Sequence, residues 1–188
     1  LYGQVRVFSW DQANGEEVLL PTQELVASPP IVEVASNGRQ TIRLVRRSAG
    51  PPAQERTYRV LIDEVAREAE SESNGVDIRL RYSVPVFVLP SGMPGKEVLA
   101  WQVFRKDGAW MLRINNSGNF HAQIGATSFV NPAGKDFGIS KGLFGYVLAG
   151  RMREWRLPVA SDAALDGVLT ISSNVNAKAI IARTSTPP

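Results

Sequence analysis

An all-β fold of two sandwich domains is predicted by three observations on this sequence. First, turn dipeptides interrupt the chain repeatedly, and each can supply the positive φ angles of a tight hairpin. Second, the runs between them have the period-two pattern of β-strands, and none shows a helical apolar stripe. Third, a proline- and glycine-rich segment at residues 89–95 separates two halves of similar pattern. The turn dipeptides are Asn14-Gly15, Asn37-Gly38, Asn74-Gly75, Asp107-Gly108 and Asp166-Gly167.

Each half contains about seven short strand-like runs, the pattern of an immunoglobulin-like sandwich. We therefore expect one immunoglobulin-like domain at residues 1–91 and a second at residues 92–188, in an L-shaped arrangement. The sequence opens directly in a strand pattern at Leu1. We expect the first strand of the first domain, and any export signal, to precede it. The expected strands are residues 4–10, 17–20, 31–34, 41–46, 56–65, 76–90, 98–105, 109–115, 120–128, 145–148, 153–158, 167–173 and 179–183.

The longest alternating run is residues 76–90, VDIRLRYSVPVFVLP. All its even positions from 76 to 88 are apolar, whereas positions 77–83 of the odd set are polar. Pro85 has no N–H for a second neighbouring strand, so we expect the run at a sheet edge. A long apolar edge is an aggregation hazard that proteins usually cover. We interpret this one as a candidate adhesive surface; the alternative is an ordinary strand that closes its own sandwich.

Composition narrows the classes of function. The chain is 44% hydrophobic and 21% charged, which is typical of a globular protein with a real core. Its net charge of +3 is dispersed, so we expect no nucleic-acid partner. No apolar run is long enough to cross a bilayer, so we expect no membrane insertion. With one histidine and no cysteine, we expect no metal site and no cofactor.

Catalytic motifs are weak. Residues 138–142, GISKG, match the nucleophile-elbow pattern, but that motif needs a helix after the serine and a histidine later in the chain. The single histidine, His121, precedes Ser140. We expect a glycine-bounded loop here and no enzyme. The tryptophans are expected to pack in the core, because their spacing does not predict an exposed sugar-binding platform.

Five segments give the chain a family resemblance, and the Ser-Pro-Pro corner followed by a glycine turn and an Arg-Leu strand is the most specific part. Together they resemble the periplasmic chaperones of the chaperone-usher pathway, which assemble pili, and look most like the archaic or alternative branch. The segments are VRVFSWDQANGEE (5–17), LVASPPIVEVASNGRQTIRLVR (25–46), ERTYRVLIDEV (55–65), RYSVPVFVLP (81–90) and LRINNSGNFHAQI (112–124).

The resemblance implies a non-enzymatic periplasmic chaperone that stabilises pilus or fimbrial subunits by donor-strand complementation and delivers them to an outer-membrane usher. A free donor edge also makes self-association an expectation. Carried over by position, the donor residues are Val76, Ile78, Leu80, Tyr82 and Val84.

Two positions of the sequence depart from the family pattern. Pro85 stands where better-known members have a lysine that anchors the subunit's terminal carboxylate, so Arg79 and Arg81 become the candidate anchors. Glu64 is the candidate for an interdomain contact, but Leu89 occupies the position of its arginine partner.

The alternative function is an adhesion or carbohydrate-binding module of two immunoglobulin-like domains, which would show an exposed aromatic platform and a strand at residues 76–88 paired on both sides.

Overall fold

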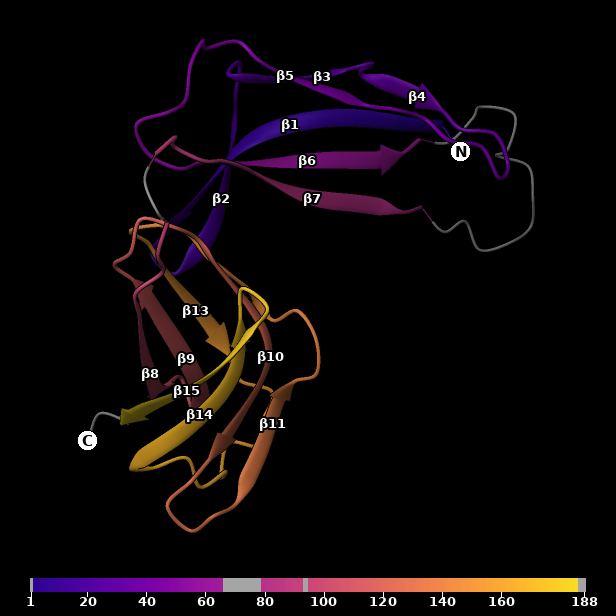
Figure 1. The fold of residues 1–188 in the computed structure, drawn as a ribbon. Coiled ribbons are helices and arrows are strands. Elements are labelled where there is room, and N and C mark those ends of the chain that lie inside the picture. The colour runs from indigo at the N-terminus through magenta and orange to yellow at the C-terminus, as the bar shows by residue number, and fades with distance from the viewer. Residues whose placement is uncertain (1, 66–78, 93–94, 186–188) are drawn as a thin grey trace, which may run out of the picture. The chain divides into compact units, whose positions relative to one another are not determined.

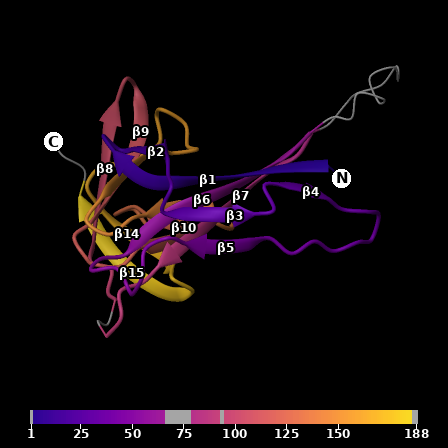
Figure 2. The same cartoon turned by 90° about the horizontal axis from the view of Figure 1, so that it is seen from above.

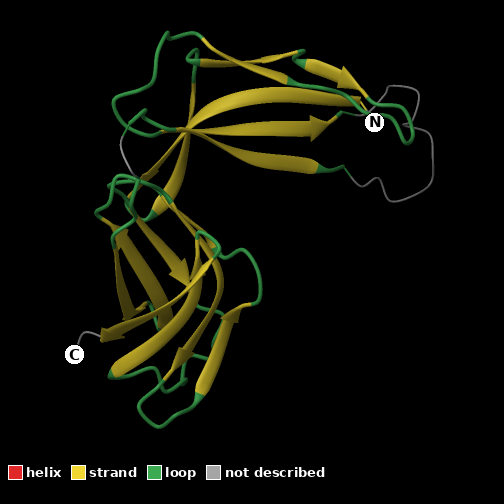
Figure 3. Ribbon diagram, viewed as in Figure 1, coloured by secondary structure: helices red, strands yellow, loops and turns green. Residues whose placement is uncertain are grey.

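The computed structural model describes residues 2–65, 79–92 and 95–185, and these contain only strands and loops (Figure 3). The predicted all-β fold is confirmed. Figure 1 shows the strands in chain order. They are β1 (Tyr2–Ala13), β2 (Glu16–Pro21), β3 (Leu25–Ser28), β4 (Ile31–Glu33), β5 (Arg43–Arg46), β6 (Arg56–Glu64), β7 (Arg81–Val88), β8 (Leu99–Lys106), β9 (Ala109–Asn116), β10 (Ala122–Val130), β11 (Asp136–Ser140), β12 (Gly145–Val147), β13 (Met152–Arg156), β14 (Val168–Val175) and β15 (Lys178–Ser185).

Contacts divide the chain into two compact units. The first comprises Leu1–Asp11 and Leu19–Ser91, and the second comprises Gln12–Val18 and Gly92–Pro188. The boundary after Ser91 lies in the proline- and glycine-rich segment of the sequence. Assignment of residues 12–18 to the second unit was not predicted, because the pattern of an isolated hairpin does not show what its tip contacts.

The first unit has a sheet in the order β2-β1-β6-β7, with β4 also paired to β1, and a two-stranded sheet of β3 and β5. In both views of the ribbon, β3 and β5 run alongside the larger sheet (Figure 1 and Figure 2). The antiparallel register places Val5 opposite Ile62 and Val7 opposite Val60. These residues share one face, as their alternation predicted. Their apolar cluster has the buried residues Val5, Ala27, Val32 and Val60.

Tyr58 ties the larger sheet to the segment before β3. Its side chain is 1% exposed, and its hydroxyl donates a hydrogen bond to Glu24 Oε2 at 2.8 Å. Burial raises the pKa of the Tyr58 phenol, and the hydrogen bond to Glu24 raises it further. The tyrosine therefore stays neutral and acts as a donor that satisfies a carboxylate at the rim of the apolar cluster.

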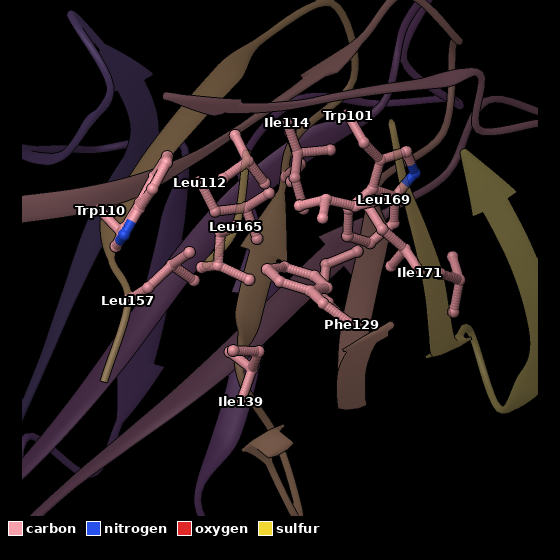
Figure 4. Close-up of a cluster of buried hydrophobic side chains, with 14 of the residues drawn as sticks. Trp101, Trp110, Leu112, Ile114, Phe129, Ile139, Leu157, Leu165, Leu169 and Ile171 are labelled. Carbon is pink, nitrogen blue, oxygen red and sulfur yellow. The ribbon is translucent and has the colours of Figure 1, made fainter. Parts of the chain in front are cut away.

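The second unit is a sandwich of two sheets. One runs β11-β10-β14-β15 with β12 also paired to β10, and the other runs β13-β9-β8. The space between them is filled by apolar side chains from both sheets and from the loops, and Phe129, Leu165 and Leu112 lie close together in the close-up (Figure 4). The buried members are Trp101, Val103, Trp110, Leu112, Ile114, Ala122, Ile124, Phe129, Ile139, Val147, Leu157, Leu165, Leu169, Ile171 and Val175.

Buried amides complete the backbone hydrogen bonds of the second unit. Gln12 is 3% exposed; its Nε2 donates to Tyr146 O at 2.8 Å and its Oε1 accepts from Leu148 N at 3.0 Å. Asn116 donates to Phe120 O and accepts from Val98 N. Each amide pairs with backbone groups that would otherwise be buried without partners.

Two of the predicted turns have the expected backbone. Asn14 and Gly15 have φ angles of 54° and 81°, and Asp107 and Gly108 have 52° and 74°, so each pair joins two neighbouring strands as a tight hairpin. Asn74-Gly75 lies outside the described residues. The core prediction for tryptophan is confirmed for Trp10, Trp101 and Trp110, which are 2%, 8% and 2% exposed.

Two expectations about local structure were wrong. The segment expected as a glycine-bounded loop at residues 138–142 begins within strand β11, where Ile139 is 7% exposed and packs into the core. Glycine hid this strand, because it interrupts the apolar signal without preventing extended backbone. Strand β3 was also missed, since its four residues are too few to show a convincing period.

Candidate functional site

Strand β7 forms one end of the larger sheet of the first unit. It is antiparallel to β6, with Arg56 opposite Val88 and Asp63 opposite Arg81. Among the described residues it pairs with no other strand. The edge position predicted from Pro85 is therefore confirmed for the part of the run that the structure describes.

The backbone direction of β7 follows from one hydrogen bond. Glu64 N donates to Leu80 O at 2.9 Å, so Leu80 and the alternate residues after it direct their backbone groups toward β6. Arg81, Ser83 and Pro85 therefore direct theirs toward the open edge. The proline lies where its missing N–H costs no bond to β6. The edge offers the N–H groups of Arg81 and Ser83 to an added strand, and Pro85 limits how far such a ladder can continue.

Apolar side chains line the same strand. Leu80, Tyr82 and Val84 are 48%, 50% and 45% exposed, and they alternate along one face. Further along this face, Val86 is half-buried and packs against the apolar cluster of the first unit. Burying one such side chain is worth roughly 1.5–3 kcal/mol. The predicted donor residues Val76 and Ile78 lie outside the described residues.

The opposite face of this sheet carries a cluster of charges. Asp63 accepts hydrogen bonds from Arg6 Nη2 at 2.5 Å and from Arg81 Nε. Both hydrogen bonds lower the pKa of the Asp63 carboxyl, and the bond from Arg6 is the larger cause. The guanidinium of Arg81, one of the two candidate anchors, therefore already has a carboxylate partner.

The other residues predicted from sequence are not all brought together. Arg79 is exposed just before β7. Glu64, the candidate for an interdomain contact, is the last residue of β6. Its Oε2 accepts a hydrogen bond from Leu80 N at 3.1 Å. That bond lies within the first unit. An interdomain role for Glu64 and anchoring by Arg79 or Arg81 remain predictions.

Arg59 is a residue of this site that sequence reasoning missed. It is 9% exposed, lies directly opposite Pro85, and places its guanidinium 3.7 Å from the ring centroid of Trp10. A buried arginine over an indole face gains a cation–π interaction. The available signal was its position between the apolar residues Tyr58 and Val60, because alternation then places its side chain on the face opposite theirs, together with Leu61.

Comparison with known proteins is decisive for the family. The family described as pili and flagellar-assembly chaperone, PapD N-terminal domain, matches residues 1–94. The chain belongs to this family. No curated protein sequence matches the chain.

Solved chaperone structures share the fold. CsuC, from the CsuC–CsuE chaperone–tip adhesion subunit pre-assembly complex of the archaic Csu pili of Acinetobacter baumannii, is 22% identical, with a TM-score of 0.70 over 100% of this chain and 86% of that one. The CupB2 chaperone of Pseudomonas aeruginosa is 16% identical, with a TM-score of 0.57 over 99% and 86%. The E. coli chaperone DraB is 18% identical, with a TM-score of 0.56 over 96% and 82%.

The described residues hold neither the context of a nucleophile elbow nor a cluster of metal ligands. Ser140 ends β11, and its hydroxyl is hydrogen-bonded within its own turn, to Gly142 O at 3.0 Å. A nucleophile elbow requires a helix directly after the serine, and none follows Ser140 in the described residues. The described part of the chain has no group of three or more metal-ligating side chains. It also has no helix of the length and hydropathy needed to span a membrane.

Proposed function

We propose that this protein is a non-enzymatic periplasmic chaperone of the archaic or alternative chaperone-usher branch. It binds a pilus subunit by adding β7, with the run that precedes it, to the subunit as a donor strand, and it delivers that subunit to an outer-membrane usher. The observation that carries the proposal is the open edge of β7 beside the exposed side chains of Leu80, Tyr82 and Val84. Unpaired backbone groups and alternating apolar side chains are what strand addition uses.

Two further observations support this function. Membership of the family implies a chaperone of pilus assembly. A protein of similar fold, CsuC, is described in complex with a tip adhesion subunit. The position of Val76 and Ile78 in the same alternating run extends the proposed donor face to the five residues identified from sequence.

The alternative, an adhesion or carbohydrate-binding module, predicted an exposed aromatic platform and a strand paired on both sides. Trp10, Trp101 and Trp110 are buried, and the described residues of β7 pair on one side. These observations favour the chaperone.

The proposal is tested by capture of a subunit. The full-length protein is produced in a bacterial periplasm with the pilus subunit encoded beside it, purified, and weighed by native mass spectrometry. We expect a one-to-one complex. Leu80→Asp should abolish it, because a charge would enter the apolar groove of the subunit without a partner.

Ser83→Asp is the matched control, since it places the same charge on the opposite face of the same exposed strand. We expect this variant to retain the complex. Circular dichroism checks that both variants remain folded. Equal capture by Leu80→Asp and the wild-type protein would rule out the donor assignment, and equal loss in both variants would rule out the proposed face.

A further inference from the structure

A second open strand edge lies in the second unit, at β15. This strand forms the end of its sheet, beside β14 (Figure 1). A two-residue turn joins the two strands. The turn residues Asn176 and Ala177 have φ angles of 48° and 62°, and Asn176 Oδ1 accepts a hydrogen bond from Gln123 N at 2.8 Å. The turn is held in place, so the edge is presented in a defined position.

The hairpin register shows which backbone groups of β15 are directed outward. A two-residue turn of this type closes on a hydrogen-bonded pair, here Val175 and Lys178. Hydrogen-bonded pairs then recur at every second residue. Ala179, Ile181 and Arg183 consequently direct their N–H and C=O groups away from β14, as a row to which another strand can pair.

The side chains of this edge combine one apolar residue with positive charge. Ile181 is 79% exposed, more than any other large hydrophobic side chain of the described residues. Arg183 lies two residues further along the same face, is exposed, and forms no ion pair with any residue that the structure describes, whereas alternation places Lys178 on the opposite face. The residues of β14 opposite Ile181 and Arg183 are Ser172 and Thr170, which are uncharged. The face of the edge that carries Ile181 is thus positive at Arg183, with no ion pair to a carboxylate among the described residues.

A groove adjoins the carboxyl-terminal part of β15. It has a volume of about 580 Å³ and lies between β15 and β8. Thr184 Oγ1 donates a hydrogen bond to Trp101 O beside it, and none of the described residues that line it is acidic. The lining residues are Ala100, Trp101, Gln102, Asn115, Val168, Arg183 and Thr184.

We propose that the β15 edge and this groove form a second binding site, which takes an extended acidic segment of a partner protein by strand addition. The segment pairs its backbone with Ala179, Ile181 and Arg183, sets an apolar side chain against Ile181, and places a carboxylate near Arg183. Charge decides between an acidic partner and a second copy of this chain. A second β15 strand would offer Arg183 no carboxylate, because residues 178–185 include no Asp or Glu. The site is separate from β7 and does not rest on subunit capture there.

The probe is a labelled peptide with an Asp-Thr-Val-Thr-Asp core. In an extended conformation its valine and both aspartates lie on the same face, with the valine in the middle. The control peptide has lysine in place of both aspartates. Amide shifts of the full-length protein are followed by NMR during titration with each peptide to about 2 mM, a range suited to weak binding. We expect saturable shifts at Ala179, Ile181 and Arg183, and roughly fivefold or greater preference for the acidic peptide that declines with added salt.

Two variants locate the binding. Ile181→Pro removes an outward N–H without removing a bond to β14, so it should abolish the shifts, whereas Ile181→Thr keeps that N–H and should retain binding. Arg183→Glu should reverse the preference between the two peptides. Thermal unfolding checks that each variant is folded, and Arg183→Glu remains informative if the proline variant is not.

Several results would overturn the proposal. They are equal binding of the basic peptide, the absence of shifts with either peptide, shifts confined to β7, and insensitivity to Arg183→Glu. A concentration-dependent dimer in ultracentrifugation that Ile181→Pro removes would assign the edge to a second copy of the chain instead.

Discussion

The two units differ most in how completely they bury their apolar residues. The described residues of the second unit form a core cluster of fifteen buried side chains, contributed by both of its sheets. Among the described residues of the first unit the corresponding cluster has four, and on its larger sheet the apolar face continues outward along β7. The second unit therefore has the packing of a self-sufficient sandwich, whereas the first presents apolar surface that a partner can cover.

The same contrast holds at the two open edges. At β7, three neighbouring same-face side chains, Leu80, Tyr82 and Val84, are about half exposed. At β15, one exposed isoleucine, Ile181, shares its face with Ala179 and the exposed Arg183. Charges of one sign discourage pairing with copies of the same strand, so β15 is protected in a way that the apolar face of β7 is not. We infer that hydrophobic burial dominates binding at β7 and charge selects the partner at β15.

The largest expected effect concerns the cores. Phe129→Ala removes a fully buried ring of the second unit and should lower the free energy of unfolding by about 3–5 kcal/mol. Val84→Ala, on the exposed part of β7, should lower it by under about 1 kcal/mol. Urea unfolding of each variant, followed by tryptophan fluorescence and by circular dichroism, measures both. Losses of similar size would contradict the difference between a closed and an open sandwich.

A smaller effect is expected at the charged cluster of the first unit. Asp63→Asn removes the carboxylate held by Arg6 and Arg81 and should lower the free energy of unfolding at pH 7 by less than about 1 kcal/mol. Because folding lowers the pKa of this carboxyl, its contribution is complete above the unfolded-state pKa of about 4 and is lost as the pH falls through the lower folded value.

Unfolding measured from pH 7 to pH 2 should therefore show the variant and wild-type curves converging in acid. Asp162→Asn is the control for loss of one negative charge, since Asp162 is exposed and has no ion pair among the described residues. A difference that persists unchanged at pH 2, or an equal pH dependence in the control, would show that Asp63 does not act through its two arginines.

Local pattern was enough to predict much of the site. The alternation of residues 80–86 identified one apolar face, and Pro85 identified an edge, because both depend on the geometry of a single strand. Pairing across strands was not predictable in the same way. Asp63 meets Arg6 and Arg81 only because β1, β6 and β7 lie in a particular register, and that register is set by packing of the whole sheet.

The fold shows the same limit. Tight hairpins such as Asn14-Gly15 follow from the backbone preferences of two residues, and the structure has them. The hydrogen bonds of Gln12 to Tyr146 and Leu148 join residues far apart in sequence, and nothing in the pattern around Gln12 marks it as buried. Strand β11 was missed because Gly138 weakened a short alternation whose core residue, Ile139, is recognisable only once the opposing sheet is in place.

The most direct test of donation by β7 is hydrogen exchange of its outward amides in the free protein and in its complex with a pilus subunit. We predict that the amides of Arg81 and Ser83 exchange rapidly in the free protein and become protected in the complex, because an added strand would accept their hydrogen bonds. The amide of Tyr82, which is directed toward β6, should be protected in both states. Unchanged rapid exchange of Arg81 and Ser83 in a one-to-one complex would contradict strand addition at this edge.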